Sequence, residues 1–189
     1  MNIRKINIHI RAVVISLALV EGSTAYANTE AVESLFTSKL FSNLPDSCPT
    51  PDAFAIAPDG ALTLSCPNFA TQNGSKPGTL LRLSPEGEVS SVGVLLDSNN
   101  QNNIRPMGLA YAPDGSLFIA DNQGKNKGRL LRVTFVDGQI DKTEVVAKGM
   151  SSPNGLRYYD GALYLTQLQL PKVKGPHISS GIYRFNEND

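Results

Sequence analysis

The sequence predicts an all-β protein of the β-propeller class, with about three blades in its 189 residues. A unit that opens on a proline occurs three times, at Pro51, Pro106 and Pro153, so the steps between units are 55 (106 − 51) and 47 (153 − 106) residues. Each unit alternates short apolar runs with tight turns and polar loops. Self-similarity at a period of about 40–50 residues, with four short strands per unit, is typical of propeller blades.

The second unit shows the pattern most clearly. Its first two strands are separated by the turn Pro113-Asp114-Gly115, in which glycine supplies the positive φ angle that other residues resist. The four strands expected in this unit cover residues 108–112, 117–120, 129–135 and 144–147.

The first and third units repeat this order. Strands are expected at 53–57, 62–66, 79–83 and 89–96 in the first unit, and at 156–158, 163–168 and 182–185 in the third. The polar run at 97–103 (DSNNQNN) predicts a solvated connector. No fourth strand follows in the third unit, which left three interpretations: the front part of a longer protein, the product of a truncated gene, or a half-ring that pairs with another chain.

The amino-terminal part predicts two further segments. Residues 1–27 resemble a secretory signal peptide, with a basic start, a nine-residue apolar run at 12–20 and a small-residue cleavage site ending at Ala27. Residues 28–47 form a lead-in, in which apolar side chains at helical spacing predict a short helix. The partial propeller then covers 48–189, with blades at about 48–104, 105–150 and 151–189.

Composition limits the partners. Removal of residues 1–27 leaves 14 basic and 16 acidic residues, a net charge of −2. This balance argues against a nucleic-acid partner or an anionic membrane surface. The signal peptide predicts a periplasmic or secreted protein, and no later segment is long and apolar enough to cross a membrane.

Two cysteines, Cys48 and Cys66, both lie in the first unit. A hairpin could bring them together, and an oxidising compartment would permit a disulfide between them. The spacing does not decide whether the bond forms. A zinc site is not expected, because two cysteines without nearby histidine supply too few ligands.

The motifs RPMGLAYAPDGSLFIADN and PNGLRYYDGALYLTQ resemble blade openings of the six-bladed propellers of the gluconolactonase/regucalcin group. They are similar also to those of strictosidine-synthase-like and paraoxonase-like relatives, and the resemblance covers about 48–185. The Pro-Asp-Gly turns are shared with NHL-type propellers. The resemblance implies a six-bladed ring and metal-dependent hydrolysis of a lactone or small ester.

Metal ligation is the main site hypothesis. The first strand of each blade lines the central channel, so the residues after the opening prolines, Asp52, Met107 and Asn154, converge there. Asp52 and Asn154 carry the side-chain oxygens that calcium prefers. The resemblance implies a divalent metal held by an acidic residue, by the Asn of an Asn-Gly opening and by a further acidic residue that this sequence does not contain. The alternative is that both residues cap turns.

Other candidates carry weaker signals. Asp121 and Asn122 end a strand and either cap the following loop or face a substrate. His177 lies in a loop with no acidic residue to orient it, so solvent exposure is favoured over a role as general base or substrate contact. The arginines and aspartates that recur at equivalent positions indicate structural roles: Arg82, Arg132 and Arg184 at strand ends, and Asp59, Asp114 and Asp160 in turns.

Two classes of function therefore remain. The first is a calcium-dependent hydrolase acting on a small-molecule lactone or ester. The second is a non-catalytic propeller that binds a ligand or protein partner, or an inactive truncated fragment. A propeller fold hosts either class.

Overall fold

The computed structural model describes residues 37–69, 76–97, 104–168 and 180–186. The chain divides into two units, 1–38 and 39–189, and all the described strands belong to the second. The predicted signal peptide and His177 lie outside the described residues. Within the described ranges, no helix is long and apolar enough to span a membrane.

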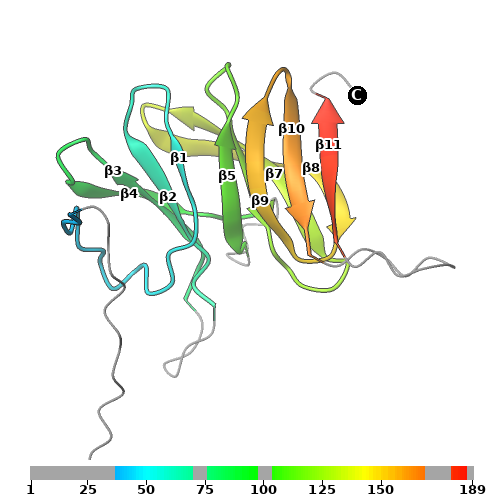
Figure 1. Ribbon diagram of the computed structural model, residues 1–189, viewed down its shortest axis with the longest axis horizontal. Helices are drawn as coiled ribbons and strands as arrows, with labels where there is room; N and C mark the ends of the chain where they lie inside the picture. Colours follow the sequence, from blue (N-terminus) through cyan, green and yellow to red (C-terminus); the bar gives the residue numbers. More distant parts are fainter. Residues whose placement is uncertain (1–36, 70–75, 98–103, 169–179, 187–189) are drawn as a thin grey trace, which may run out of the picture. The chain divides into compact units, whose positions relative to one another are not determined.

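The second unit consists of antiparallel strands in three sheets, each a meander in which neighbours along the chain are neighbours in the sheet (Figure 1). The first sheet holds β1 (Phe54–Ile56), β2 (Leu62–Cys66), β3 (Thr79–Leu83) and β4 (Val89–Val94). The second holds β5 (Pro106–Tyr111), β6 (Leu117–Asp121), β7 (Gly128–Val136) and β8 (Gln139–Met150). The third holds β9 (Pro153–Tyr159), β10 (Ala162–Gln167) and β11 (Gly181–Asn186).

The all-β fold and the three predicted units are confirmed, and each sheet is one propeller blade. The turns behave as the sequence indicates, because Gly60 and Gly115 take φ angles of 88° and 84°. The carboxylates of Asp59 and Asp114 accept hydrogen bonds from the backbone two residues on. Several strands are longer than predicted, and the difference is greatest for β8, which covers 139–150 because it pairs with the whole length of β7.

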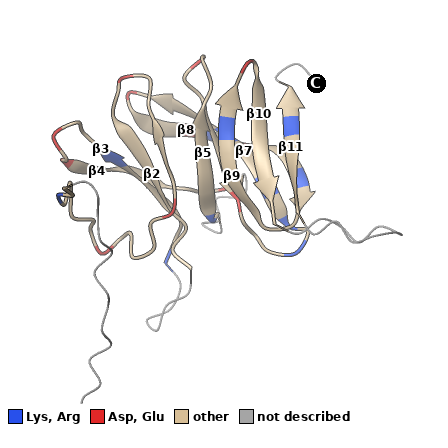
Figure 2. Ribbon diagram, viewed as in Figure 1, with Lys and Arg blue, Asp and Glu red and all other residues tan. Residues whose placement is uncertain are grey.

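Apolar side chains form the contacts between consecutive blades. One cluster joins the first and second blades and includes Leu80, Leu109 and Leu131. A second cluster joins the second and third blades and includes Leu130 and Leu165, with Leu156 packed against it. Figure 2 shows that the strands carry few charged residues and that acidic residues lie mainly in turns and at strand ends. Burial of one apolar face against the next blade therefore holds the sheets together.

Two glycines set how closely the blades approach. A Cβ atom on Gly78 would lie 2.8 Å from Cδ of Pro106, and one on Gly128 would lie 2.5 Å from Cδ of Pro153. Each opening proline thus packs on a glycine at the start of the third strand of the preceding blade. Only glycine leaves room for this contact.

The lead-in differs from its prediction. Residues 37–44 contain no helix, and Leu40 is exposed. The rest of the predicted helix lies outside the described residues. The segment instead lies against the first blade, where Ser42 Oγ donates to the Gly87 carbonyl over 2.7 Å and Leu44 packs beside Leu83.

Cys48 and Cys66 form a disulfide. Both residues are buried in the same apolar cluster, which covers the face of the first blade that points away from the second blade. The bond therefore fastens the end of the lead-in to β2.

Candidate functional site

The residues that follow the opening prolines occupy different environments. Asp52 as a whole residue is exposed, and Asn154 in β9 is partly buried. Met107 is buried in the apolar cluster between the second and third blades. Only Asp52 and Asn154 can offer side-chain oxygens. Met107 is a packing residue.

The backbone around Asn154 is held in place by its neighbours. Thr166 Oγ1 accepts a hydrogen bond from the Gly155 N–H over 2.8 Å. Gly108, in β5 of the second blade, lies very close to the backbone of β9. A Cβ atom added to Gly108 would lie 2.5 Å from Leu156 N and 2.8 Å from Gly155 C. The first strands of the second and third blades are thus in backbone contact at Asn154-Gly155.

Asp52 is the titratable group at these openings. Burial raises the pKa of its carboxyl group, because desolvation disfavours the charged form. Its backbone N–H donates to the Ser65 carbonyl over 3.0 Å, which extends the pairing of the first two strands. A partly desolvated carboxylate is a group that a bound cation would stabilise.

The oxygen atoms of Asp52 and Asn154 fit calcium in kind, since calcium takes oxygen ligands. They do not fit it in number. Within the described ranges, no group of three or more His, Cys, Asp or Glu side chains is placed to hold a metal ion. A complete site at these openings therefore requires further ligands.

Asp121 lies elsewhere, in a buried polar network. Its side chain is fully buried, and its Oδ1 accepts hydrogen bonds from the Arg105 backbone N–H over 2.7 Å and from Gln123 Nε2 over 2.6 Å. Arg129 Nε lies 2.5 Å from Asp121 Oδ2, and Arg129 Nη1 lies 3.7 Å from Asp97 Oδ2. These contacts join the start of β5, the end of β6 and the start of β7.

The sequence analysis missed Asp97, Arg105, Gln123 and Arg129 as members of this network. Asp97 was read as part of the solvated connector, yet it is buried. The sequence signal for this network was the presence of complementary charges: Arg105 and Arg129 on one side, and Asp97 and Asp121 on the other. Because these residues are far apart in the sequence, their spacing did not indicate that they are in contact.

Asn122 caps a loop, as one of the two alternatives expected. Its side-chain oxygen accepts a hydrogen bond from the Gly124 N–H over 3.1 Å, and its backbone N–H donates to the Arg105 carbonyl over 2.9 Å. A substrate contact for Asp121 or Asn122 stays a prediction.

The recurrent arginines take up related positions. Arg82 pairs with Asp59 of its own blade, and Arg132 Nη2 lies 2.5 Å from Asp114 Oδ2. Arg184 Nε donates instead to the Tyr164 hydroxyl over 3.2 Å. In two blades the arginine of the third strand therefore binds the aspartate of the first turn.

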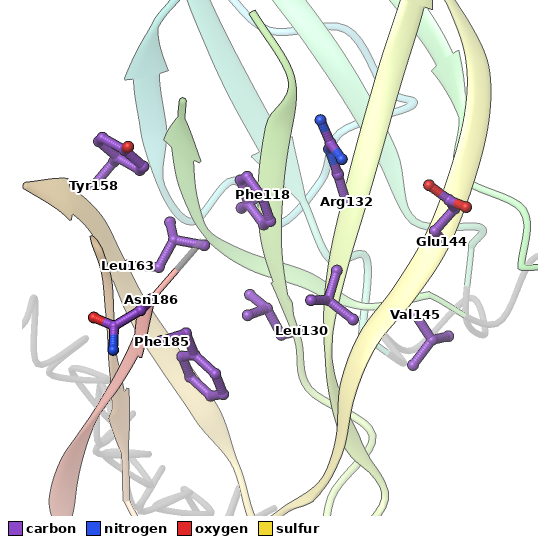
Figure 3. Close-up of a pocket in the computed structure, with 10 residues that line it drawn as sticks. Phe118, Leu130, Arg132, Glu144, Val145, Tyr158, Leu163, Phe185 and Asn186 are labelled. Atoms are coloured by element: carbon purple, nitrogen blue, oxygen red, sulfur yellow. The ribbon is translucent and has the colours of Figure 1, made fainter. Parts of the chain in front are cut away.

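A cavity of about 330 Å³ lies between the second and third blades (Figure 3). Aromatic rings of Phe118, Tyr158 and Phe185 line it together with aliphatic side chains, and Arg132 and Glu144 lie at its polar side. Arg132 is already paired with Asp114, and Glu144 with Lys142 over 2.5 Å. The cavity is suited to binding an apolar group and carries no arrangement of nucleophile and base.

No family model matches the sequence, and no curated protein matches it. Solved structures do match. A gluconolactonase from Xanthomonas campestris aligns with a TM-score of 0.50 and 18% identity, over 72% of this chain and 43% of that one. A proposed gluconolactonase aligns with a TM-score of 0.44 and 23% identity, over 62% and 41%. The PQQ-bound aldose sugar dehydrogenase from Streptomyces coelicolor aligns with a TM-score of 0.42 and 19% identity, over 72% and 49%.

The likeness to the Xanthomonas campestris enzyme establishes the class of fold: this chain is a β-propeller protein. The propeller fold that the sequence motifs predicted is thereby confirmed. The chain spans less than half the length of each of these structures.

Proposed function

We propose that this protein is an exported propeller that hydrolyses a lactone or a small ester with the help of a divalent cation, calcium. The observation that carries the proposal is the pair of oxygen-bearing side chains at two blade openings, one of which is a partly desolvated carboxylate. Similarity to a gluconolactonase fold supports the reaction class.

Asp52 and Asn154 would hold the cation together with further ligands. A bound calcium ion supplies Lewis-acid polarisation of the substrate carbonyl. The carboxylate of Asp52 would balance part of the charge of the ion. The amide oxygen of Asn154 would be a neutral ligand that fixes the position of the ion. The contacts of Gly155 with Thr166 and of Gly108 with the β9 backbone would keep Asn154 in position.

The test measures calcium binding and turnover separately. Calcium at about 100 times its Kd should stabilise the fold by about 2.7 kcal/mol, which corresponds to a rise in Tm of about 5–10 °C for a domain of this size. Asn154→Ala and Asp52→Asn should each remove most of that rise and abolish hydrolysis of an aldonolactone. Asp137→Asn is the matched control, because Asp137 lies in the turn between β7 and β8, at the end of β7 away from the blade opening, and should leave both readouts unchanged.

An unchanged calcium response in both variants would remove Asp52 and Asn154 from the site. Full turnover in the presence of a chelator would overturn the metal requirement.

The cavity between the second and third blades favours a second candidate, ligand binding without turnover. This candidate predicts no calcium effect on Tm and no lactone hydrolysis. It also predicts that filling the cavity with Leu163→Trp blocks the stabilisation produced by small aromatic ligands.

A further inference from the structure

The first strand of each blade is irregular where it begins. In the second and third blades, two residues of the first strand lie opposite one residue of the second strand, which is a β-bulge. In the first blade, the Ser65 carbonyl accepts from the Asp52 N–H over 3.0 Å, and the Ser65 N–H donates to the Ala53 carbonyl over 2.8 Å. One residue therefore faces two in this blade as well. The bulged pairs, each of which begins with the residue after the opening proline, are Asp52-Ala53, Met107-Gly108 and Asn154-Gly155.

A side-chain hydroxyl lies opposite the bulge in the first and third blades. Ser65 Oγ accepts a hydrogen bond from the Ala53 N–H over 3.0 Å and donates to the Ala53 carbonyl over 3.0 Å. Thr166 Oγ1 accepts from the Gly155 N–H over 2.8 Å and donates to the Gly155 carbonyl over 3.4 Å. In both blades the hydroxyl is thus bonded to the backbone of the residue directly after the candidate ligand.

The second blade provides a comparison within the same chain. The residue opposite its bulge is Ala120, which has no hydroxyl and is fully buried. The bulge forms nonetheless, so this backbone shape does not require a hydroxyl. Its opening residue is Met107, whose side chain packs in an apolar cluster. Among the three blades described, the hydroxyl therefore accompanies the two opening residues that carry a side-chain oxygen.

The physical role of the hydroxyl follows from the bulge. A bulge disrupts the ladder of hydrogen bonds between two strands and changes the direction of a side chain. Hydrogen bonds to both the N–H and the carbonyl of the next residue fix the backbone on that side of the bulge. Met107 is held by the apolar side chains around it, whereas Asp52 is exposed and Asn154 is only partly buried. These two residues therefore depend on the backbone for a fixed direction.

We propose that Ser65 and Thr166 are positioning residues, which hold Asp52 and Asn154 in the orientation that binds a divalent cation. The identity of the bound group rests on the proposed function, whereas the hydrogen bonds of the two hydroxyls do not depend on it. Residues that orient metal ligands from outside the coordination shell typically change metal affinity by about 10–100-fold when they are replaced.

The test uses variants that remove one hydroxyl each. Ser65→Ala removes the hydroxyl of the first blade, and Thr166→Val removes that of the third, where the side chain is exposed and the substitution leaves the core intact. Thr63→Val is the matched control: Thr63 lies in the same strand as Ser65 and is equally buried, but its hydroxyl bonds to the Tyr111 hydroxyl over 2.7 Å. Thr166→Ser keeps the hydroxyl and should behave as the wild-type protein does.

The first readout is the Kd for calcium, measured by isothermal titration calorimetry. Ser65→Ala and Thr166→Val should each weaken calcium binding by about 10-fold or more. Thr63→Val should lower the Tm and leave the Kd unchanged. Wild-type affinity in both hydroxyl variants overturns the inference. Equal weakening in Thr63→Val also overturns it, because calcium affinity would then follow overall stability.

The second readout needs no calcium. Three-bond NMR couplings report the χ1 angles of Asp52 and Asn154, and each residue should occupy one χ1 rotamer in the wild-type protein. The couplings of Asp52 should become averaged in Ser65→Ala, and those of Asn154 in Thr166→Val. Averaged couplings in the wild-type protein, or couplings that neither variant changes, overturn the inference. A wild-type protein that binds no calcium overturns the proposed function, and the couplings then decide the positioning role by themselves.

Discussion

At the scale of single residues, the side chain of Asp121 is held by several partners at once. Its carboxylate is fully buried and is compensated by the Arg129 guanidinium, the Gln123 amide and the Arg105 backbone N–H. A buried charge is tolerated only when such partners satisfy it. Asp121 therefore ties together three segments of the second blade.

Replacing Asp121 with Asn should destabilise the protein by about 3 kcal/mol, because the mostly buried Arg129 would keep its charge without its nearest carboxylate. Urea denaturation measures the change. Asp114→Asn is the control: the Asp114–Arg132 pair is half exposed, and its loss should cost no more than about 1 kcal/mol. Equal losses in the two variants would contradict the buried-network interpretation.

The pKa of Asp52 gives a second prediction at this scale. Its folded pKa is raised by desolvation, so the folded state binds a proton more tightly than the unfolded state. The contribution of Asp52 to the free energy of unfolding is most favourable below pH 3.8, the pKa of this group in the unfolded state. That contribution is lost as the pH rises through the higher pKa of Asp52 in the folded state. In calcium-free buffer at pH 7, Asp52→Asn should therefore stabilise the fold slightly.

The gain should disappear below pH 3.8, where the wild-type carboxyl group is already protonated. Thermal melts of both proteins from pH 3 to 7 would show it. Asp114 provides the opposite case: hydrogen bonds from Ser116 and the Arg132 charge lower its pKa, so its contribution is lost as pH falls through the lowered value. A destabilised Asp52→Asn protein at pH 7 without calcium would refute the assignment.

At the scale of secondary-structure elements, close backbone contact sets the position of β9 on β5. The φ angle of Gly108 is not positive, so alanine can adopt its backbone conformation. The only obstacle to alanine at this position is the steric overlap of its Cβ atom. Its Cβ would overlap the backbone of Asn154-Gly155 and push the strands apart.

Gly108→Ala should destabilise the protein by about 3 kcal/mol or more, at the upper end of overpacking effects. It should also weaken any calcium binding that depends on Asn154. Gly124→Ala is the control: its Cβ would meet nothing within 4 Å, and the positive φ of 77° limits the cost to about 1–2 kcal/mol. Chemical denaturation of both variants compares them, and a larger loss in Gly124→Ala would count against the close-contact argument.

At the scale of the whole chain, the disulfide constrains the unfolded state. Cys48 and Cys66 are 18 residues apart, and a cross-link across a loop of this length stabilises a protein by about 3 kcal/mol in the chain-entropy model. The Cys48→Ser/Cys66→Ser protein should lose about that much stability relative to the oxidised chain. The denaturation midpoint should fall with little change in the blade structure, as seen by circular dichroism. A midpoint equal to that of the oxidised chain would contradict this role for the bond.

Local sequence patterns are sufficient to predict the blades. Proline openings, Pro-Asp-Gly turns and alternating apolar runs act within a few residues, so they predict where the strands of the three units lie. They also indicated the turn roles of Asp59 and Asp114, which depend only on a neighbouring backbone. The spacing of the cysteines allowed a disulfide but did not decide it.

The burial of Asp97 and Asp121 and the absence of a helix over residues 37–44 became visible only in the tertiary structure. Asp121 meets Arg105 and Arg129 only after three segments fold together, and no local pattern encodes that contact. The lead-in showed helical spacing, yet its described part packs on the first blade without forming a helix, because apolar contact and the disulfide outweigh a weak helix signal. Periodicity reports which side of a strand is apolar, whereas only the packed blades show which neighbouring sheet that side contacts.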